Sequence, residues 1–435
     1  MKKIKIGIIG FGTIGSGLVR TLSSKRAYLR EKAGVDIEIA RICDKDLRSR
    51  RPVKVSRKIL TKSIGKVLYD PDISIVVELI GGMRPAKEII LEALRQGKHV
   101  VTANKALLSE SGYEIFNLAN SLGLCVGFEA SVGGGIPIIR ALREGFVANR
   151  INLIYGIING TSNFILSEMA EGGHSFKEAL LIAQEKGYAE RDPYLDISGG
   201  DSCHKLAVLA LLGFGIPARP ADIYTEGITD IEVSDIQYAR ELGYSIKLLA
   251  IAKRCGDLIE LRVHPTLIPA GHLLANVNGV YNGILVDGDL VGENFFFGEG
   301  AGPHPTSSAV ASDIVAIARG ISCHRKREKC VVFKRDVSGI HRIDEVRTRY
   351  YIRFSAIDRP GVLARISGIL GKHGISIASV TQKEKRASKV VPIVMMTHEA
   401  RESDMTDALR EIDRMSAIKK RSVRVRMESD ICTGA

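Results

Sequence analysis

Four carboxylates and a lysine lie close together in the middle of this chain. They are Glu190, Asp192, Asp196, Asp201 and Lys205. Carboxylates can hold the ammonium group of an amino-acid substrate, and a buried lysine can lose enough of its pKa to exchange a proton near neutral pH. The spacing of Asp201 and Lys205, one helical turn, is also that of an ordinary exposed salt bridge. The four acids could instead bind a metal ion, although their spacing fits no EF-hand loop.

A glycine motif near the N-terminus has the spacing of a dinucleotide-binding turn. It follows an expected strand at residues 3–10 and opens an expected helix. The first glycine permits the tight turn, the second lets the backbone approach a pyrophosphate, and the third packs helix on strand. The free N–H groups at the start of the helix favour phosphate. The residues expected to contact the cofactor are Gly10, Phe11, Gly12, Thr13, Ile14 and Gly15. The alternative is a tight turn that binds no nucleotide.

Charged residues follow the next expected strand, at residues 36–43. Asp44 is placed to bind the adenosine ribose hydroxyls of NAD, whereas Arg48, Arg50 and Arg51 could neutralise the 2′-phosphate of NADP. Because both kinds of residue are present, the choice between NAD and NADP stays open. A solvated charged loop is the alternative interpretation for most of these arginines.

Lys105 follows another expected strand, at residues 99–103. If that strand belongs to a parallel sheet, Lys105 lies at the carboxyl edge, where ligands bind. A lone lysine at this position is also compatible with an ordinary solvated side chain.

A glycine-rich turn at residues 131–137 comes directly after Glu129. Such a turn can bind an anion through its N–H groups or a monovalent cation through its carbonyl groups. The alternative is a flexible elbow between two domains.

The elements that must position these residues change in type along the chain. Strands and helices alternate in the first third, which predicts βαβ units and a parallel Rossmann sheet. Expected strands are 3–10, 36–43, 73–80, 99–103 and 124–129, and expected helices are 14–31, 85–96 and 109–121. The middle has a strand at 150–158, helices at 136–142, 164–171, 175–186, 202–213 and 307–319, and short β-runs over 258–297. We expect an α+β substrate domain with a mixed sheet there.

The last 80 or so residues have the order βαββαβ, which predicts a ferredoxin-like domain. Expected strands are 350–357, 375–382, 389–397 and 422–427, and expected helices are 360–373 and 403–415. The charged stretch before them predicts a linker. The expected domains are 1–130, 131–301, a linker at 326–349, and 350–428.

The composition and the absence of certain motifs argue against nucleic acid and membrane as partners. The 435 residues carry a net charge of +13, which raises nucleic acid as a partner, but we find no helix-turn-helix, zinc-finger or stacked-aromatic motif, and tryptophan is absent. The seven cysteines form no Cys-x-x-Cys pair, which favours a reducing cytoplasm. No apolar run reaches the ~18–20 residues of a membrane span. We therefore expect neither nucleic acid nor membrane as a partner.

Longer motifs resemble those of the homoserine dehydrogenases over nearly the whole chain. They are Gly-Phe-Gly-Thr-Ile-Gly at 10–15, Thr-Ala-Asn-Lys at 102–105, Glu-Ala-Ser-Val-Gly-Gly-Gly-Ile-Pro at 129–137, Asn-Gly-Thr-Ser-Asn-Phe-Ile-Leu at 159–166, and the run from Gly187 to Lys205. The resemblance implies NAD(P)H-dependent reduction of L-aspartate 4-semialdehyde to L-homoserine, in threonine, methionine and isoleucine biosynthesis. Another amino-acid-pathway dehydrogenase of the same fold and a purely sensing regulator are the alternatives.

The resemblance also implies roles for individual residues. Lys205 becomes the acid/base lysine, Lys105 lies between nicotinamide and substrate, and the homoserine is held by Glu190 and Asp201 with Asp196 close by. Gly187 and Gly302 line the cofactor. Residues from about 302 to 325 complete the dinucleotide-binding domain, and the domain at 131–301 also serves dimerisation. A sodium site is implied at Glu129 and the carbonyls of Val132, Gly134 and Ile136.

The tail from about residue 350 resembles an ACT domain. The turn from the first strand to the first helix, with Asp358, Pro360 and Gly361, is where such domains bind a regulatory amino acid. The resemblance implies L-threonine as effector and a homodimer or homotetramer. A purely structural dimerisation module is the alternative.

Overall fold

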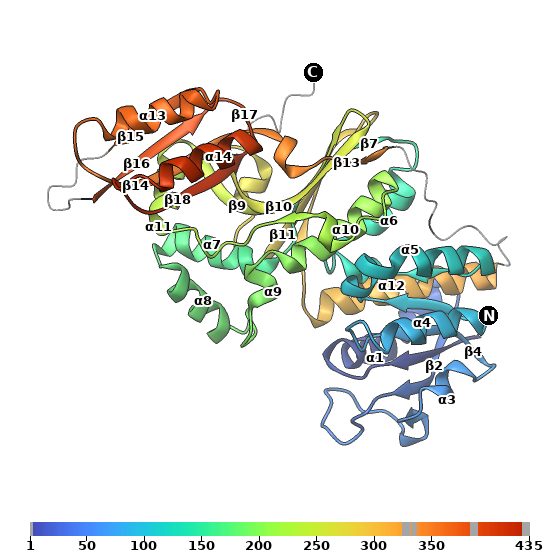
Figure 1. The fold of residues 1–435 in the computed structure, drawn as a ribbon. Helices are drawn as coiled ribbons and strands as arrows, with labels where there is room; N and C mark the ends of the chain where they lie inside the picture. Colours follow the sequence, from blue (N-terminus) through green and yellow to red (C-terminus); the bar gives the residue numbers. More distant parts are fainter. Residues whose placement is uncertain (1–2, 324–330, 332–336, 383–389, 429–435) are drawn as a thin grey trace. The chain divides into compact units, whose positions relative to one another are not determined.

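The computed structural model describes residues 3–323, 331, 337–382 and 390–428. The chain forms two compact units (Figure 1). Unit 1 contains Met1–Asn152, His204–Ala221 and Asp287–Val337, and unit 2 contains Leu153–Cys203, Asp222–Val286 and Ser338–Ala435. No helix within the described ranges is long and apolar enough to cross a membrane.

Unit 1 is built on a parallel six-stranded sheet with the order β3-β2-β1-β4-β5-β6. The strands are β1 (Lys3–Ile9), β2 (Asp36–Cys43), β3 (Leu60–Thr61), β4 (Ile73–Glu78), β5 (His99–Thr102) and β6 (Val126–Gly127). The chain winds outward from β1 in one direction and then in the other, so the carboxyl ends of β1 and β4 meet at a switch point. The predicted Rossmann domain is confirmed.

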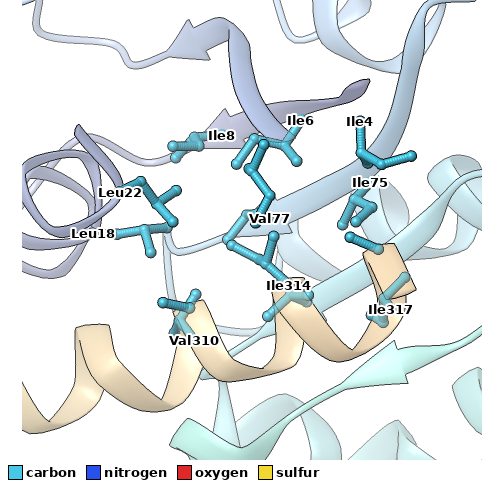
Figure 2. Close-up of a cluster of buried hydrophobic side chains, with 14 of the residues drawn as sticks. Ile4, Ile6, Ile8, Leu18, Leu22, Ile75, Val77, Val310, Ile314 and Ile317 are labelled. Atoms are coloured by element: carbon cyan, nitrogen blue, oxygen red, sulfur yellow. The ribbon is translucent and has the colours of Figure 1, made fainter. Parts of the chain in front are cut away.

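Helices pack on this sheet and close its core. They are α1 (Thr13–Ser24), α2 (Arg26–Ala33), α3 (Gly65–Leu68), α4 (Ala86–Arg95), α5 (Lys105–Leu122) and α12 (Pro303–Ser322). Figure 2 shows Val310, Ile314 and Ile317 of α12 against Ile75 and Val77 of β4, with the α1 leucines beside them. Burial of these side chains attaches α12 to the sheet, although β6 ends at Gly127 and α12 begins only at Pro303.

One expected helix of unit 1 is wrong in extent. The sequence pattern predicts a single helix at 14–31, but α1 ends at Ser24 and α2 begins at Arg26. The Ser24 hydroxyl donates to the Thr21 carbonyl at 3.4 Å, and such local bonds compete with the helical ladder. Unit 1 also contains α6 (Ile138–Arg140) with a π-type turn (Ala141–Gly145), and β12 (Gly292–Glu299).

Unit 2 holds a mixed sheet in which β11 (Tyr281–Gly288), β7 (Ile151–Ile157), β9 (Tyr244–Cys255) and β10 (Leu258–Pro269) are consecutive neighbours. β9 pairs antiparallel with β7 and β10, whereas β8 (Tyr224–Thr225) pairs parallel with β10. Its helices are α7 (Gly160–Gly172), α8 (Phe176–Glu185), α9 (Tyr194–Ile197) and α11 (Val233–Glu241), and α10 (Gly200–Phe214) runs from unit 2 into unit 1. The mixed sheet is as predicted; the sequence pattern assigned neither α11 nor β9.

The C-terminal part of unit 2 has the predicted ferredoxin-like order. Its elements are β14 (Arg347–Ile357), α13 (Val362–Lys372), β15 (Ile377–Gln382), β16 (Val390–Thr397), β17 (Ala400–Arg401), α14 (Glu402–Asp413) and β18 (Ile418–Met427). The strands are ordered β18-β14-β16-β15 and are antiparallel. Both helices bury apolar side chains in one cluster with those of the sheet. Figure 1 draws these elements as red and orange ribbons.

This C-terminal sheet is joined to the rest of unit 2 by backbone pairing. β18 pairs parallel with β10 at Thr266↔Arg426 and Leu267↔Met427. The expected linker at 326–349 lies partly outside the described residues, at 326–330 and 332–336. Its described part is tied down, because β13 (Gly339–Ile340) pairs with β10 and the Ser338 N–H donates to the Asp257 carbonyl at 2.6 Å.

Candidate active site

The glycine motif forms the turn between β1 and α1, and its three glycines are required for different reasons. Gly10 has φ 105° and a Cβ there would lie 2.6 Å from the Leu79 carbonyl carbon, while a Cβ on Gly15 would collide with the Gly10 carbonyl. These two glycines are therefore required by the chain's own packing. A Cβ on Gly12 would meet nothing within 4 Å, so the space above Gly12 is open for a ligand. This open backbone fits the pyrophosphate of a dinucleotide.

The start of α1 favours an anion. Gly12 occupies the N-cap position and offers no side chain to the first N–H groups, and the first turn carries no acidic residue. The helix therefore presents backbone donors and the positive end of its dipole beside the open glycine. Thr13 and Ile14 are the first two residues of this helix.

Asp44 ties the loop after β2 to the glycine turn. Its carboxylate accepts the Phe11 N–H at 2.5 Å and the Asp46 N–H at 2.8 Å. Arg51 reinforces this contact, because its Nε donates to the Phe11 carbonyl at 2.6 Å and its guanidinium lies 5.7 Å from the Phe11 ring centre. Arg51 is thus part of the loop's framework, whereas the side chains of Arg48 and Arg50 are exposed.

Two buried side chains that the sequence analysis missed shape the ends of β4 and β5. Glu78 accepts the N–H groups of Ile80 and Gly81 at 2.8 and 3.1 Å and the Thr102 hydroxyl at 2.7 Å. Asn104 caps α5 by accepting the Leu107 N–H, and its Nδ2 donates to the Gly82 carbonyl at 2.6 Å. An acid at the end of a buried apolar run was the available signal for Glu78. These bonds fix Lys105 as the first residue of α5, at the carboxyl edge of the sheet.

A pair of buried carboxylates lies beside the glycine-rich turn in unit 1. Glu129 accepts the N–H groups of Ile139 and Arg140, both at 2.9 Å, and its own N–H donates to Asp313 Oδ2 at 2.8 Å. Burial and the neighbouring Asp313 raise the pKa of Glu129 to about 7, and burial raises that of Asp313 to about 6. A cation would relieve this unfavourable pair of charges.

The turn that follows Glu129 is tightly constrained. It contains Val132, Gly134 and Ile136, and Gly134 has φ 57°. A Cβ on Gly134 would lie 2.5 Å from the Gly300 carbonyl group, so only glycine permits this approach. A buried carboxylate followed by a turn of backbone carbonyls is the donor chemistry that suits a hard monovalent cation.

The acidic cluster lies in unit 2, where one amide brings two of its members together. Asn159 Nδ2 donates to Asp196 Oδ1 at 2.7 Å and to Asp201 Oδ2 at 2.8 Å. The same residue caps α7 through the Ser162 N–H, and the Ser162 hydroxyl donates to the Asp196 carbonyl at 2.6 Å. Asn159 is the residue that reasoning from this cluster missed, although it opens the motif at 159–166 and precedes an expected helix.

The other acids of the cluster are exposed. Glu190 contributes its carbonyl to the Gln184 amide at 3.2 Å, and Asp192 accepts the Tyr194 N–H. Asp201 and Lys205 are both buried and share α10, one turn apart. In the part of the chain that the structure describes, no three His, Cys, Asp or Glu side chains are grouped to hold a metal ion, so a four-acid metal site has no support.

The remaining predicted site residues lie in turns. Gly187 ends the turn after α8 with φ 74° in unit 2, and Gly302 precedes α12 with φ 121° in unit 1. Asp358 and Pro360 are exposed between β14 and α13, and Gly361 caps α13 with φ 85°. These five residues therefore lie in turns that connect well-packed elements.

Comparisons with known proteins agree over the full length. Three family models match: "Homoserine dehydrogenase, NAD binding domain" at residues 10–129, "Homoserine dehydrogenase" at 137–315, and "ACT domain" at 350–416. A homoserine dehydrogenase of Pseudomonas aeruginosa is 44% identical over 98% of this chain and 99% of its own length. One of Neisseria gonorrhoeae is also 44% identical, over 99% of both chains.

Solved structures give the same result. The crystal structure of a homoserine dehydrogenase from Thiobacillus denitrificans has a TM-score of 0.91 and 45% identity, covering 99% of both chains. A hyperthermophilic archaeal homoserine dehydrogenase in complex with NADPH has a TM-score of 0.62 and 26% identity, covering 73% of this chain and 98% of that one. The chain therefore belongs to the homoserine dehydrogenase family, as an oxidoreductase that acts on a CH–OH group and carries a C-terminal ACT domain.

Proposed function

We propose that the chain interconverts L-aspartate 4-semialdehyde and L-homoserine with a nicotinamide cofactor, as a step in threonine, methionine and isoleucine biosynthesis. The observation that carries the proposal is the convergence of Asp196 and Asp201 on Asn159, one helical turn before the buried Lys205. Two fixed carboxylates suit an ammonium group, and a buried lysine suits a group that gains or loses a proton.

The reacting carbon exchanges a hydride and the attached oxygen exchanges a proton. When bound, the nicotinamide supplies or accepts the hydride. Lys205 donates a hydrogen bond to the aldehyde oxygen as negative charge develops on it, transfers the proton that completes the alcohol, and removes that proton in the reverse direction. Glu190, Asp196 and Asp201 hold the substrate ammonium, and Lys105 orients the substrate at the carboxyl edge of the sheet.

The residues of the glycine motif fit the cofactor. The backbone from Gly10 to Gly15 would cradle the pyrophosphate, with Gly187 and Gly302 lining the remainder. Asp44 is placed for the ribose hydroxyls, and the exposed Arg48 and Arg50 for a 2′-phosphate. We therefore propose NAD or NADP as the cofactor.

Glu129 and the carbonyls of Val132, Gly134 and Ile136 fit a sodium ion. The ion would neutralise the buried Glu129–Asp313 pair and stiffen the turn that leads into α6. Its role in this proposal is structural.

The ACT domain supports control by an amino acid, which we propose to be L-threonine bound near Asp358, Pro360 and Gly361. We further propose a cytoplasmic homodimer or homotetramer. The functional division is 1–130 with 302–325 for the cofactor, 131–301 for the substrate, 326–349 as linker and 350–428 for regulation.

Absorbance at 340 nm tests the proposal directly. The purified full-length chain is incubated with L-homoserine and NAD or NADP, with and without L-threonine. Homoserine-dependent formation of reduced cofactor is expected, and L-threonine is expected to lower the rate. Turnover of a different hydroxy acid with none of homoserine would contradict the proposed substrate.

A further inference from the structure

A buried arginine of the ACT domain joins two carboxylates that belong to different parts of unit 2. Arg426 on β18 is fully buried; its Nε and Nη2 donate to Glu402 at 2.9 and 2.6 Å, and its Nη1 donates to Glu226 Oε2 at 2.7 Å. Glu402 opens α14 inside the ACT domain. Glu226 instead follows β8, beside the substrate-domain strand β10. The guanidinium therefore connects the regulatory domain to the catalytic part of the unit.

Glu226 is held firmly in its charged form. Burial alone would disfavour the carboxylate, but Arg426 outweighs it and lowers the pKa of Glu226 to about 2. Arg424 lies 3.3 Å from the same carboxylate, and the Tyr224 hydroxyl hydrogen-bonds to it. The Glu226 N–H donates to the Val263 carbonyl at 2.7 Å, which fixes the backbone as well. Arg426 is fully buried and Glu226 is partly buried. Removing the carboxylate would leave a buried guanidinium without one of its partners, which is costly.

The segment that carries Glu226 packs directly on the turn of α9. Gly227 leaves no space for a Cβ, which would meet the Ile197 carbonyl and lie 2.8 Å from Ser198 Cα. The Ile228 N–H donates to the same Ile197 carbonyl at 2.9 Å. A Cβ on Gly199 would lie 3.2 Å from the Glu226 carbonyl oxygen. The turn at 197–199 is the stretch of chain between Asp196 and Asp201.

We propose that Arg426 and Glu226 are positioning residues through which the ACT domain sets the geometry of the Asp196–Asp201 turn. The inference rests on the proposed function, because that function assigns the substrate ammonium to this turn. The path is short and continuous: the guanidinium holds the Glu226 carboxylate, residues 226–228 hold residues 197–199, and these hold the two aspartates. A shift of β18 caused by an amino acid in the ACT domain would reach the substrate-binding residues along the same path.

A second arginine of the ACT domain provides a matched control. Arg353 on β14 donates to Asp235 at 2.6 and 3.0 Å, and both side chains are buried. This pair also joins the ACT domain to the catalytic part of unit 2 and is likewise an arginine–carboxylate pair, with a carboxylate more deeply buried than that of Glu226. Its carboxylate, however, lies on α11 and not in the segment that packs on residues 197–199. Loss of this pair loosens the ACT domain without acting through the proposed path.

The experiment compares Glu226→Gln with Asp235→Asn in the full-length chain. For Glu226→Gln we expect the KM for L-homoserine to rise about 5- to 10-fold, the lower end of ordinary coupling between sites, with the KM for the cofactor within about twofold of the unmodified chain. Hydrogen–deuterium exchange in peptides that cover 190–201 should accelerate in this variant. Asp235→Asn should change neither quantity. Equal effects of the two substitutions, or no effect of Glu226→Gln on either readout, would overturn the proposal.

Tyr224→Phe keeps the test decisive if Glu226→Gln does not fold. It removes only the hydroxyl that contacts Glu226 and accepts from Arg426 Nη2 at 2.9 Å. A rise of about two- to threefold in the homoserine KM with faster exchange at 190–201 is expected, and unchanged values would contradict the path. Failure of the proposed function is distinguishable, because a chain that never turns over homoserine still reports the coupling through the exchange measurement.

Discussion

The glycine turn of unit 1 and the acidic cluster of unit 2 are both candidate binding sites, but they are organised in opposite ways. In the glycine turn, backbone groups face the open space, and the side chains of Asp44 and Arg51 serve to hold loops together. In the acidic cluster, side chains face one another, and Asn159 holds Asp196 and Asp201 by their carboxylates. We infer that binding at the glycine turn, which depends on the shape of the backbone, tolerates substitution of neighbouring side chains. Binding at the acidic cluster, which depends on charge, requires each of its side chains.

The largest effect in this comparison should come from the proton-transferring residue of the charge-based site. Lys205→Ala is expected to lower kcat on homoserine by at least ~10²-fold, the usual scale for losing a general acid–base, while the chain stays folded. Steady-state kinetics and a thermal melt measure the two properties. Partial rescue by an added small alkylamine would support the assignment, and activity within threefold of the unmodified chain would rule it out.

Asn159→Ala should come next, because it leaves two carboxylates close together without their shared donor. We expect a rise of about 10-fold in the KM for homoserine and a smaller change in the KM for the cofactor, consistent with the loss of hydrogen bonds to charged groups. Initial-rate kinetics with either substrate varied give both constants. Asn276→Ala is the control, since its Nδ2 donates only to backbone carbonyls of the loop after β10. An equal change in both KM values would show that Asn159 supports the fold in general and not the substrate.

Glycines of the turn serve either the packing of the chain or contact with the cofactor, and this predicts opposite outcomes for two similar substitutions. Gly15→Ala should cost about 1–3 kcal/mol of unfolding free energy, because the new methyl meets the Gly10 carbonyl. Gly12→Ala should leave the unfolding free energy within about 0.5 kcal/mol and weaken cofactor binding several-fold. Denaturant unfolding and fluorescence titration with reduced cofactor measure these effects. A destabilised Gly12→Ala with unchanged cofactor affinity would reverse the interpretation of the turn.

The smallest effect concerns the choice of cofactor. Asp44→Ala should weaken NAD more than NADP, because it removes the acceptor for the ribose hydroxyls and leaves the arginines in place. Both cofactors should lose some affinity, since the same carboxylate accepts the Phe11 N–H of the glycine turn. The ratio of kcat/KM for the two cofactors measures the effect. A greater loss with NADP would show that the ribose assignment of Asp44 is wrong.

The same contrast decides what could be predicted from the sequence. The glycine motif is contiguous, so its turn follows from residues 10–15 together with the strand before and the helix after. The acidic cluster was found as a group of charges, but Asn159 lies 42 residues before Asp201, and no local pattern reveals that they meet. Glu226 and Arg426 are 200 residues apart, and both lie in stretches that read as ordinary charged surface. The sequence does not show that Arg426 is buried and bonded to Glu226, because this depends on the pairing of β18 with β10.

Contacts between distant parts of the chain also explain the helix and strand that were not predicted, because tertiary packing overrides local propensity there. Neither α11 nor β9 was assigned, although Asp235 of α11 is fully buried between Tyr351 and Arg353 of the ACT domain. An acid inside a helix pattern normally indicates a solvent-facing side. Here its partners come from a strand more than 100 residues later, and only the folded chain supplies them.

The pairing of β18 with β10 bears on how regulation should be dissected genetically. Deleting the ACT domain would leave Thr266 and Leu267 of β10 without their strand partner, and an unpaired strand edge invites association between molecules. It would also remove both arginines that contact Glu226. A shortened chain that lacks feedback would therefore be uninformative, because aggregation and a distorted substrate turn produce the same phenotype. Single substitutions in the exposed turn at Asp358, Pro360 and Gly361 leave the β10–β18 pairing and the arginine contacts of Glu226 intact. They are therefore the appropriate way to obtain an enzyme that no longer responds to the regulatory amino acid.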